Sequence, residues 1–254
     1  MAAPAHEALY MSITIILLLC QSELFVPQDM LRFADHLYSQ EDYAAALHEY
    51  RRYIFLADSV GQDIHERIIE CLTRLGRYGE AITETENLSD INKRNYTKGL
   101  VYFAASDLDS SRIYLNLVDV PYESDARRIM GLGYAYEFRF NEAATYIQLP
   151  KNKPAYKKPT IGALLSLFPG GGHFYTGRFG DGLYSLLIVS TAALLSYYYY
   201  DHGENLKFGF SLGAAILLYA GNIYGGINAV RNYNYYESEK YLEQIMESTQ
   251  PRIE

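Results

Sequence analysis

Two long apolar stretches near the C-terminus, residues 183–199 and 208–230, constrain the fold of this chain most strongly. A helix needs roughly 20 residues to cross the hydrocarbon core of a bilayer, so each stretch is about long enough for one span. Only eight residues, 200–207, separate the stretches, and seven of them, 201–207, hold all the Asp, Glu, Lys and His residues between the stretches. This pattern predicts a helical membrane hairpin, with the lipid bilayer as its partner, and disfavours a soluble enzyme.

The average composition hides a difference between two parts of the 254-residue chain. Residues 27–158 are rich in charge, whereas residues 160–230 carry few charges and much of the glycine. The formal net charge of −8 disfavours a nucleic-acid partner, because such binding depends on Lys and Arg. Several of the 26 tyrosines lie at the ends of the apolar stretches, at 197–200 and 233–236. Tyrosine favours the interface between bilayer and water, which again indicates a membrane.

The N-terminal region holds a shorter apolar run, residues 11–20. Its length is typical of a signal peptide, with Cys20 and Ser22 as small residues before a cleavage after Ser22. Residues 1–10 contain no Lys or Arg, so the usual positive segment is missing, and translation could begin at Met11. A lipoprotein signal at Cys20 is less favoured. The first 22 residues are therefore interpreted as a signal peptide, with an uncleaved anchor or an apolar first helix as alternatives.

A degenerate repeat of about 34 residues occupies residues 29–150 in four copies. In the first, third and fourth copies two small residues lie twelve apart, and an aromatic residue follows the first of them by three or four positions. The second copy departs from the pattern, with Ile69 where a small residue is expected. The residues predicted to pack within and between repeats are Ala34, Tyr43, Ala46, Tyr50, Tyr78, Ala81, Gly99, Tyr102, Gly131, Tyr134 and Ala143.

This pattern predicts stacked pairs of helices. A small residue on the first helix lets the second approach closely, and one pair cannot bury its apolar face alone. The segment FADHLYSQEDYAAALHEYRRY, in the first copy, resembles the tetratricopeptide repeat most clearly. The resemblance implies a helical solenoid that binds an unidentified protein or peptide on its concave face and seldom carries chemistry. An irregular array of helical hairpins is the alternative, with the same fold class.

A turn rich in glycine and aromatic residues precedes the first apolar stretch. Its predicted turn residues are Pro169, Gly170, Gly172, His173, Tyr175, Gly177 and Gly182. This turn resembles that of TM2-type membrane hairpins. The wider run, PGGGHFYTGRFGDGL with GNIYGGINAVRNYN, resembles uncharacterised bacterial envelope proteins that join tetratricopeptide repeats to such a hairpin. The resemblance implies membrane attachment and an extracytoplasmic repeat domain, but no established activity.

The second apolar stretch carries a row of glycines at intervals of four, interrupted once by Leu217: Gly209, Gly213, Gly221 and Gly225. Small residues at this spacing let membrane helices pack closely, so the row is predicted to be a packing seam. The favoured partner is the first stretch, through Ser185, Ser190, Ala193 and Ser196, and the alternative is a homodimer. Asn222 and Asn228 are polar at membrane depth, and an interhelical hydrogen bond is favoured over a transport role for both.

No catalytic, metal or cofactor motif is recognisable. His65-Glu66 lacks the second histidine of a zinc-protease motif, and residues 170–182 match neither common nucleotide-binding loop. Cys20 and Cys71 are too few for a disulfide framework, and Cys71 is expected to be a buried, inert thiol. His173, near Arg178 and Asp181, is expected to order its loop through a hydrogen bond.

The sequence thus predicts an all-α protein, a degenerate tetratricopeptide-like solenoid followed by a transmembrane helical hairpin. Its predicted parts are residues 1–22, the solenoid at 29–150, a basic linker at 151–159, the hairpin at 160–232 and a Tyr-rich helix and tail at 233–254. The favoured function is that of a non-catalytic, membrane-anchored adaptor of the cell envelope. The alternative is a membrane-assembly or transport component in which the hairpin is active and the solenoid regulatory.

Two signals disagree on which side of the membrane the solenoid lies. Basic residues favour the cytoplasmic side of a span. They flank the hairpin at Lys151, Lys153, Lys157, Lys158, Arg178 and Arg231, against Lys207 alone in the connecting loop. This distribution favours a cytoplasmic solenoid, whereas the N-terminal apolar run favours export. We expect export, which makes the solenoid extracytoplasmic.

Overall fold

The computed structural model describes residues 26–57 and 59–249, and the part of the chain that it describes is helical, without β-strands. This confirms the all-α class. The interpretation of residues 1–22, with Cys20 and the alternatives for their role, lies outside the described residues. The chain folds into two compact units, the first ending at Ile147 and the second beginning at Gln148.

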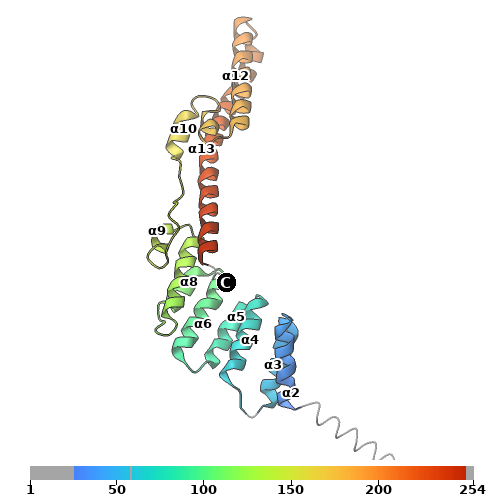
Figure 1. The fold of residues 1–254 in the computed structure, drawn as a ribbon. Coiled ribbons are helices and arrows are strands. Elements are labelled where there is room, and N and C mark those ends of the chain that lie inside the picture. Colours follow the sequence, from blue (N-terminus) through green and yellow to red (C-terminus); the bar gives the residue numbers. More distant parts are fainter. Residues whose placement is uncertain (1–25, 58, 250–254) are drawn as a thin grey trace, which may run out of the picture. The chain divides into compact units, whose positions relative to one another are not determined.

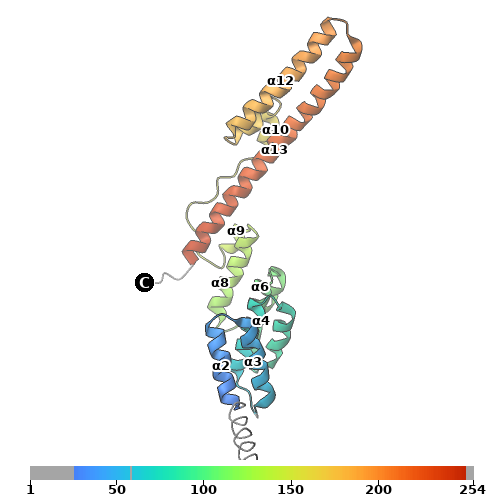
Figure 2. The ribbon, with the colours of Figure 1, turned by 90° about the vertical axis from the view of Figure 1, so that its right-hand side faces the viewer.

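The first unit consists of short helices joined by tight turns (Figure 1). Its α-helices are α2 (Pro27–Ser39), α3 (Tyr43–Leu56), α4 (Gln62–Arg74), α5 (Tyr78–Glu84), α6 (Ile91–Ala104), α7 (Leu108–Leu115), α8 (Glu123–Tyr136) and α9 (Phe140–Ala143). A 3₁₀ turn, η1 (Thr85–Asn87), extends α5. The helices pack as consecutive pairs, α2 with α3, α4 with α5, α6 with α7 and α8 with α9, and each pair contacts the next. This succession runs from blue to green in Figure 1, and Figure 2 shows the same helices turned by 90°.

Two apolar clusters form the core of the first unit. One joins α2 to α6 and includes the fully buried Tyr50, Ile68 and Leu72. The other surrounds Leu115 and Met130 on α7 and α8. Since each cluster draws on more than one helix pair, the pairs bury apolar surface against one another.

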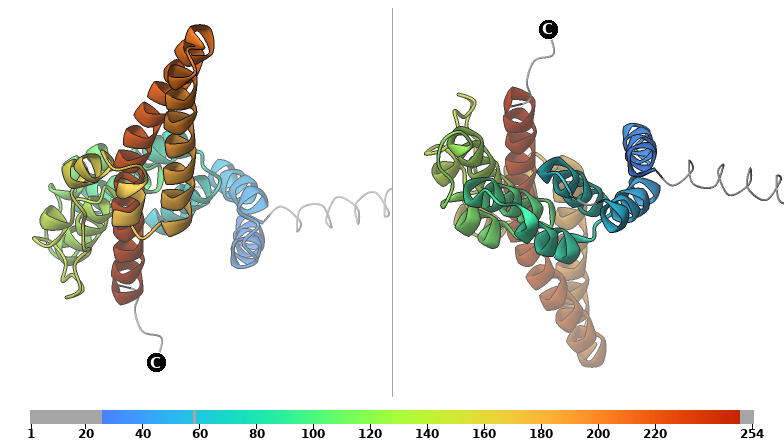
Figure 3. Two further views of the ribbon diagram at one scale, coloured as in Figure 1. Left: turned by 90° about the horizontal axis from the view of Figure 1, so that it is seen from above. Right: turned by 90° about the horizontal axis from the view of Figure 1, so that it is seen from below.

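The second unit contains two short helices, α10 (Pro159–Leu165) and α11 (Gly171–Tyr175), and two long ones, α12 (Phe179–Asp201) and α13 (Asn205–Thr249). Both long helices are long and apolar enough to cross a membrane. In Figure 3, α12 lies along the N-terminal half of α13, and the two helices contact each other. The short helices contact α13, and α11 also contacts α12.

The second long helix differs from the prediction. A span at 208–230 and a separate helix at about 233–248 were expected, but α13 is one helix of 45 residues. The composition changes from apolar to polar near Arg231, yet no proline or glycine occurs between residues 227 and 249. A change of polarity alters which surroundings a helix prefers but does not break its backbone hydrogen bonds.

The segment before α10 is extended and is attached to the polar end of α13. Asn234 bonds the backbone of Lys157 twice, accepting from its N–H and donating to its carbonyl, each at 2.8 Å. The Tyr241 hydroxyl donates to the Pro150 carbonyl at 2.8 Å. The Lys157 ammonium donates to the Tyr175 carbonyl at 2.6 Å and lies over the Tyr233 ring. These contacts fix the start of α10 relative to α11 and α13.

Candidate binding groove and hairpin core

The small residues predicted for the repeats lie between the helices of each pair. Ala34, Ala46, Ala81 and Ala143 are fully buried. A Cβ added to Gly99 would lie 2.5 Å from the Leu115 side chain, and one added to Gly131 would lie 2.7 Å from Ile147. In both copies the large residue follows the glycine by sixteen positions. The absence of a side chain at the glycine therefore makes room for the large residue of the facing helix.

The second copy reverses this arrangement. Ile69 is large where the other copies are small, and the residue sixteen positions later, Thr85, is smaller than its counterparts Tyr50, Leu115 and Ile147. Both Ile69 and Thr85 are buried. In this copy the larger side chain lies at the first of the two positions and the smaller at the second, so together they still fill the space between the helices.

The turn inside each pair has the same backbone conformation in all four copies. Glu41, Gly76, Ser106 and Phe138 have φ values of 61°, 71°, 61° and 57°, which is the left-handed region. Each follows the first small position, or Ile69 in the second copy, by seven residues. The next residue caps the second helix in two copies, where Asp42 and Asp107 accept from the N–H of Ala45 and Ser110, each at 3.1 Å.

The aromatic residues predicted for the repeats contact other rings, cations or acids. Tyr102 stacks on Tyr114 with ring centroids 5.4 Å apart, and Tyr134 stacks on Tyr146 at 5.5 Å. Tyr43 meets Tyr38 edge to face at 5.7 Å, and Tyr50 donates to Asp35 at 2.7 Å. Tyr78 packs against the first core cluster. The Arg112 guanidinium lies 4.7 Å from the centre of the Tyr134 ring, which joins the third and fourth pairs.

A groove of about 810 Å³ lies between α4 and α6 in the first unit. Its aliphatic lining, here called the floor, consists of Ile69, Leu100, Val101 and Ala104. The rings of Tyr96 and Tyr122 also line the groove and stack with centroids 5.0 Å apart. Polar side chains complete the lining: Glu66, Glu70, Thr73, Arg74, Lys93 and Thr97. The resemblance to the tetratricopeptide repeat implies a binding face on the concave side, but none of these residues was predicted to belong to it.

The ionised groups that line the groove are paired. Lys93 on α6 donates to the Glu66 carboxylate on α4 and so links the two walls. Hydrogen bonding to Glu66 raises the pKa of Lys93, so its ammonium stays protonated. Arg74 lies 3.7 Å from Glu70 on the same helix. The four charged side chains around the groove are thus held in two pairs.

The glycine-rich turn of the second unit is a site of close backbone contact. Gly170 has φ = 83°, and a Cβ there would overlap the Gly182 carbonyl oxygen. A Cβ on Gly172 would lie 2.5 Å from Gly226 Cα, and one on Gly182 would lie 2.5 Å from the Phe174 ring. Pro169 and Gly177 belong to the turns on either side of α11, and Gly177 has φ = 79°. These glycines let α11 sit against α13 and α12.

Asn222, on α13, is the centre of the polar contacts in the hairpin. It is 5% exposed, and its amide nitrogen donates to the Ser166 carbonyl at 2.6 Å. Its Oδ1 accepts from the Gly170 N–H and from the Ser185 hydroxyl, each at 2.8 Å. The bond to Ser185 on α12 is the interhelical hydrogen bond expected for Asn222. Its amide thus joins α12, α13 and the turn.

His173 differs from the prediction. Its Nδ1 is buried and has no hydrogen-bond partner within residues 26–57 and 59–249. The side chain that orders the Pro-Gly turn is instead Asn222. His173 lines a cavity of about 400 Å³ with Arg178, Asp181 and Ser185, and Arg178 donates to Asp181 at 2.6 Å.

The glycine row on α13 is not a seam with α12. A Cβ added to Gly209, Gly213 or Gly221 would meet no atom within 4 Å, and one on Gly225 would lie 3.2 Å from His173. Each step of four residues turns a helix by about 40° beyond a full turn, so a row of five positions sweeps roughly 160° and cannot face one neighbour. The residues buried on this part of α13 are Ala215, Asn222 and Gly226, at intervals of seven and four. The prediction of a seam with α12 is therefore wrong for Gly209, Gly213 and Gly221.

The close contacts of the second unit also include residues that the sequence pattern did not single out. A Cβ on Gly226 would overlap the Ser166 hydroxyl, and one on Gly162 would lie 2.5 Å from Val230.

No protein-family model matches the chain, and neither the curated proteins nor the solved structures give a significant match. The described fold therefore defines a class only, an all-α protein with two long apolar helices in its C-terminal unit.

Proposed function

We propose that this chain is a membrane-anchored, non-catalytic protein-interaction module of a bacterial cell envelope. In this proposal the first unit is a tetratricopeptide-like solenoid that holds a segment of a partner protein, and α12 and α13 anchor it as a transmembrane hairpin. The groove between α4 and α6 is the observation that carries the interaction role.

The exposed apolar side chains of α12 and α13 support anchoring. Leu194 is 69% exposed, Phe210 76% and Leu217 75%, although all three lie on helices long enough to span a bilayer. Burial of apolar surface contributes about 25 cal/mol per Å², and soluble proteins seldom leave a continuous apolar surface of this kind in water. Asp201, Glu204 and Lys207 lie together at the connecting turn, where a hairpin needs polar groups.

The chemistry of the groove indicates an extended peptide segment as its ligand. Leu100 and the rings of Tyr96 and Tyr122 offer apolar surface for one or two side chains, whereas Ile69 and Val101 are almost fully buried. Thr97 and Thr73 line the same groove, and the Thr97 hydroxyl can bond a peptide backbone. The Thr73 hydroxyl donates to the Ile69 carbonyl at 2.7 Å and can only accept from a ligand. Peptide-binding surfaces combine apolar pockets with polar groups in this manner.

Crosslinking in cells tests the interaction role. A photoreactive amino acid at Leu100, on the groove floor, is expected to capture a defined protein. The same residue at Ile113, which is 63% exposed on α7 away from the groove, is the control and is expected not to capture it. Thr97→Arg should fill the groove and abolish the crosslink, whereas Thr83→Arg, an exposed threonine of α5, should preserve it. Equal capture at Leu100 and Ile113 would contradict the proposal.

Extraction tests the anchor separately. Full-length protein should remain with membranes during a carbonate wash, because removal of two apolar helices would expose their surface to water. Release of the protein into the wash would contradict the anchor but leave the groove untouched.

Reporter fusions test the sidedness. We propose that the first unit is extracytoplasmic and that the turn at 201–207 faces the cytoplasm. Alkaline phosphatase fused after residue 150 should then be active, whereas a reporter that requires the cytoplasm should be silent. The opposite pair of results would place the partner in the cytoplasm and show that the flanking basic residues determine the topology.

A further inference from the structure

The second unit exposes a further apolar surface that belongs to neither long helix. It consists of side chains on α10 and the following turn: Ile161, Leu164, Leu165, Leu167 and Phe168. Leu164 is 67% exposed and Phe168 59%. We infer that residues 159–171, here called the wedge, re-enter one leaflet of the bilayer and pack against lipid acyl chains. This inference rests on the proposed membrane insertion of α12 and α13.

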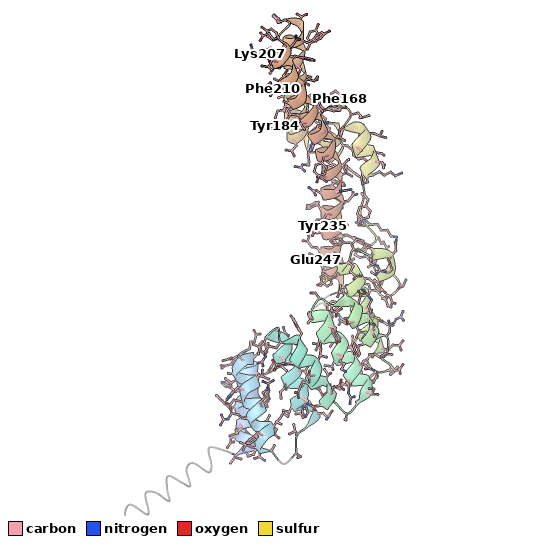
Figure 4. All side chains as sticks on the ribbon, turned by 180° about the vertical axis from the view of Figure 1, so that it is seen from behind. Phe168, Tyr184, Lys207, Phe210, Tyr235 and Glu247 are labelled. Atoms are coloured by element: carbon pink, nitrogen blue, oxygen red, sulfur yellow. The ribbon has the colours of Figure 1, made fainter. Side chains whose placement is uncertain are left out.

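The contacts of the wedge with α13 give its depth. At the start of the wedge, Gly162 packs against Val230. At its other end, residues 166–171, here called the tip, the Leu167 carbonyl accepts from the Tyr219 hydroxyl at 2.9 Å. The wedge thus runs along α13 from Val230 to Tyr219, which corresponds to about 16 Å of helix. Tyr219 lies twelve residues from Lys207 and twelve from Arg231, the charged residues at the two ends of this apolar stretch. The tip therefore lies near the middle of the part of α13 that would be in lipid. Figure 4 labels Phe168, in the tip, and Lys207, at one end of that part of α13.

The backbone of the wedge tip is prepared for surroundings without water. A non-helical segment can lie at membrane depth only where its polar groups have partners within the protein. Ser166, Leu167 and Phe168 donate their N–H groups to carbonyls three or four residues earlier, at 3.0–3.2 Å. Gly171 donates to the Phe168 carbonyl at 2.9 Å, and Pro169 has no N–H.

Further groups of the tip are bonded by side chains of α13. Asn222 accepts from the Gly170 N–H and donates to the Ser166 carbonyl, and Tyr219 donates to the Leu167 carbonyl. Polar groups turned inward and apolar side chains turned outward are what an acyl-chain environment requires.

The opposite end of the wedge carries positive charge. Lys158 is exposed immediately before α10, and Arg231 is exposed beside Val230, at the level where the wedge begins. Lys151 and Lys153 are exposed a few residues earlier. Long basic side chains at this level can reach the polar headgroup region of the leaflet that the wedge enters.

Site-specific depth measurement tests the wedge. Full-length protein with Cys20→Ala and Cys71→Ala receives one cysteine at Phe168, at Ile216 or at Glu243, and each variant carries a nitroxide label in vesicles of phosphatidylcholine and phosphatidylglycerol. Ile216 is 59% exposed on the apolar part of α13, and Glu243 lies on its polar part. Oxygen, which partitions into acyl chains, and a water-soluble nickel chelate report the surroundings of each label.

We expect the ratio of oxygen to nickel accessibility at residue 168 to lie within about twofold of that at residue 216 and far above that at residue 243, because both sites would lie in acyl chains. A nickel-accessible label at 168 beside a lipid-exposed label at 216 would overturn the wedge and leave the anchor intact. If the nickel chelate reached the labels at both residue 168 and residue 216, the wedge and the membrane anchor would both be overturned. Protection of residue 168 from both reagents would mean that protein, such as a second copy of the chain, covers this face, and would also overturn the lipid assignment.

Discussion

Gly170 and Asn222 lie 52 residues apart in the sequence, and the Gly170 N–H donates to Asn222 Oδ1 at 2.8 Å. The same amide also bonds Ser166 and Ser185. One side chain of α13 therefore holds the end of α10, the Pro-Gly turn and α12. Because its three bonds lie in the interior of the unit, their loss leaves buried polar groups without partners.

Asn222→Leu is accordingly expected to destabilise the second unit by about 2–4 kcal/mol, since each buried polar group left unpaired costs about 1–3 kcal/mol. Thermal unfolding in detergent measures this effect. Gly221→Ala is the control, because a Cβ at that neighbouring position meets no atom within 4 Å. Equal melting temperatures for the two variants would contradict a central role for Asn222.

The reversed volumes at Ile69 and Thr85 predict a coupled pair. Thr85→Leu alone should overfill the α4–α5 interface and cost about 1–3 kcal/mol. Ile69→Ala alone should leave a cavity and cost about 2–4 kcal/mol. Together they restore the small-and-large order of the other copies, so the double variant should be more stable than the sum of the single effects by at least about 1 kcal/mol. Hydrogen exchange in α4 measures each variant, and simple additivity would rule out the coupling.

The glycines of α13 are expected to divide into two groups. Gly213→Leu and Gly221→Leu should leave the folding of the chain unchanged, because both positions face open space. Gly226→Ala should disrupt it, because the added Cβ would overlap the Ser166 hydroxyl and lie 3.1 Å from Gly172 Cα. Protease resistance in detergent distinguishes the groups. Loss of a crosslinked dimer in the two leucine variants alone would locate the glycine row between copies of the chain.

Cys71 predicts a loss of stability in alkali. Burial raises the pKa of its thiol to about 11, above its ordinary value of 9.0. Between these values the folded state keeps a proton that the unfolded state releases, so stability falls as pH rises, by at most about 1.4 kcal/mol per pH unit for one group. Burial and the bond to Asp35 raise the pKa of Tyr50 too, which adds to the loss above pH 10. Denaturant titrations from pH 8 to 10 check the slope, and Cys71→Ala should reduce it; an unchanged slope would contradict the assignment to Cys71.

The sequence allowed the helical class and the lengths of the apolar stretches to be predicted, because both depend on local pattern. The spacing of small residues at Ala34 and Ala46, or Gly99 and Ser111, also depends on positions within one helix pair. The continuity of α13 through Arg231 was missed, because a change in composition was taken for a helix end. The glycine row was predicted to face α12. Positions four residues apart rotate around α13 by about 40° per step, so the row does not face one helix.

The groove and the hairpin core could not be predicted by the same means. Ile69 and Leu100 line one groove only because two helix pairs stack, and no local pattern specifies the width between α4 and α6. The sequence predicts Asn222 to be a polar residue at membrane depth, but its partners Ser166 and Gly170 lie more than 50 residues earlier in the sequence. Such a pairing follows from the tertiary fold alone.

The left-handed turns inside the helix pairs imply an unused reserve of stability. Only the second copy has glycine at this position, Gly76, whereas Glu41, Ser106 and Phe138 adopt the same conformation with side chains. A side chain in this region costs roughly 1–2 kcal/mol, and glycine recovers most of it despite its greater freedom in the unfolded chain. Glu41→Gly and Ser106→Gly, both at exposed positions, could thus stabilise the array without touching its core or its groove. Phe138→Gly would also remove the ring contact with Phe140, so its gain should be smaller. At Glu41 and Ser106 the chain is less stable than its own backbone conformation would allow.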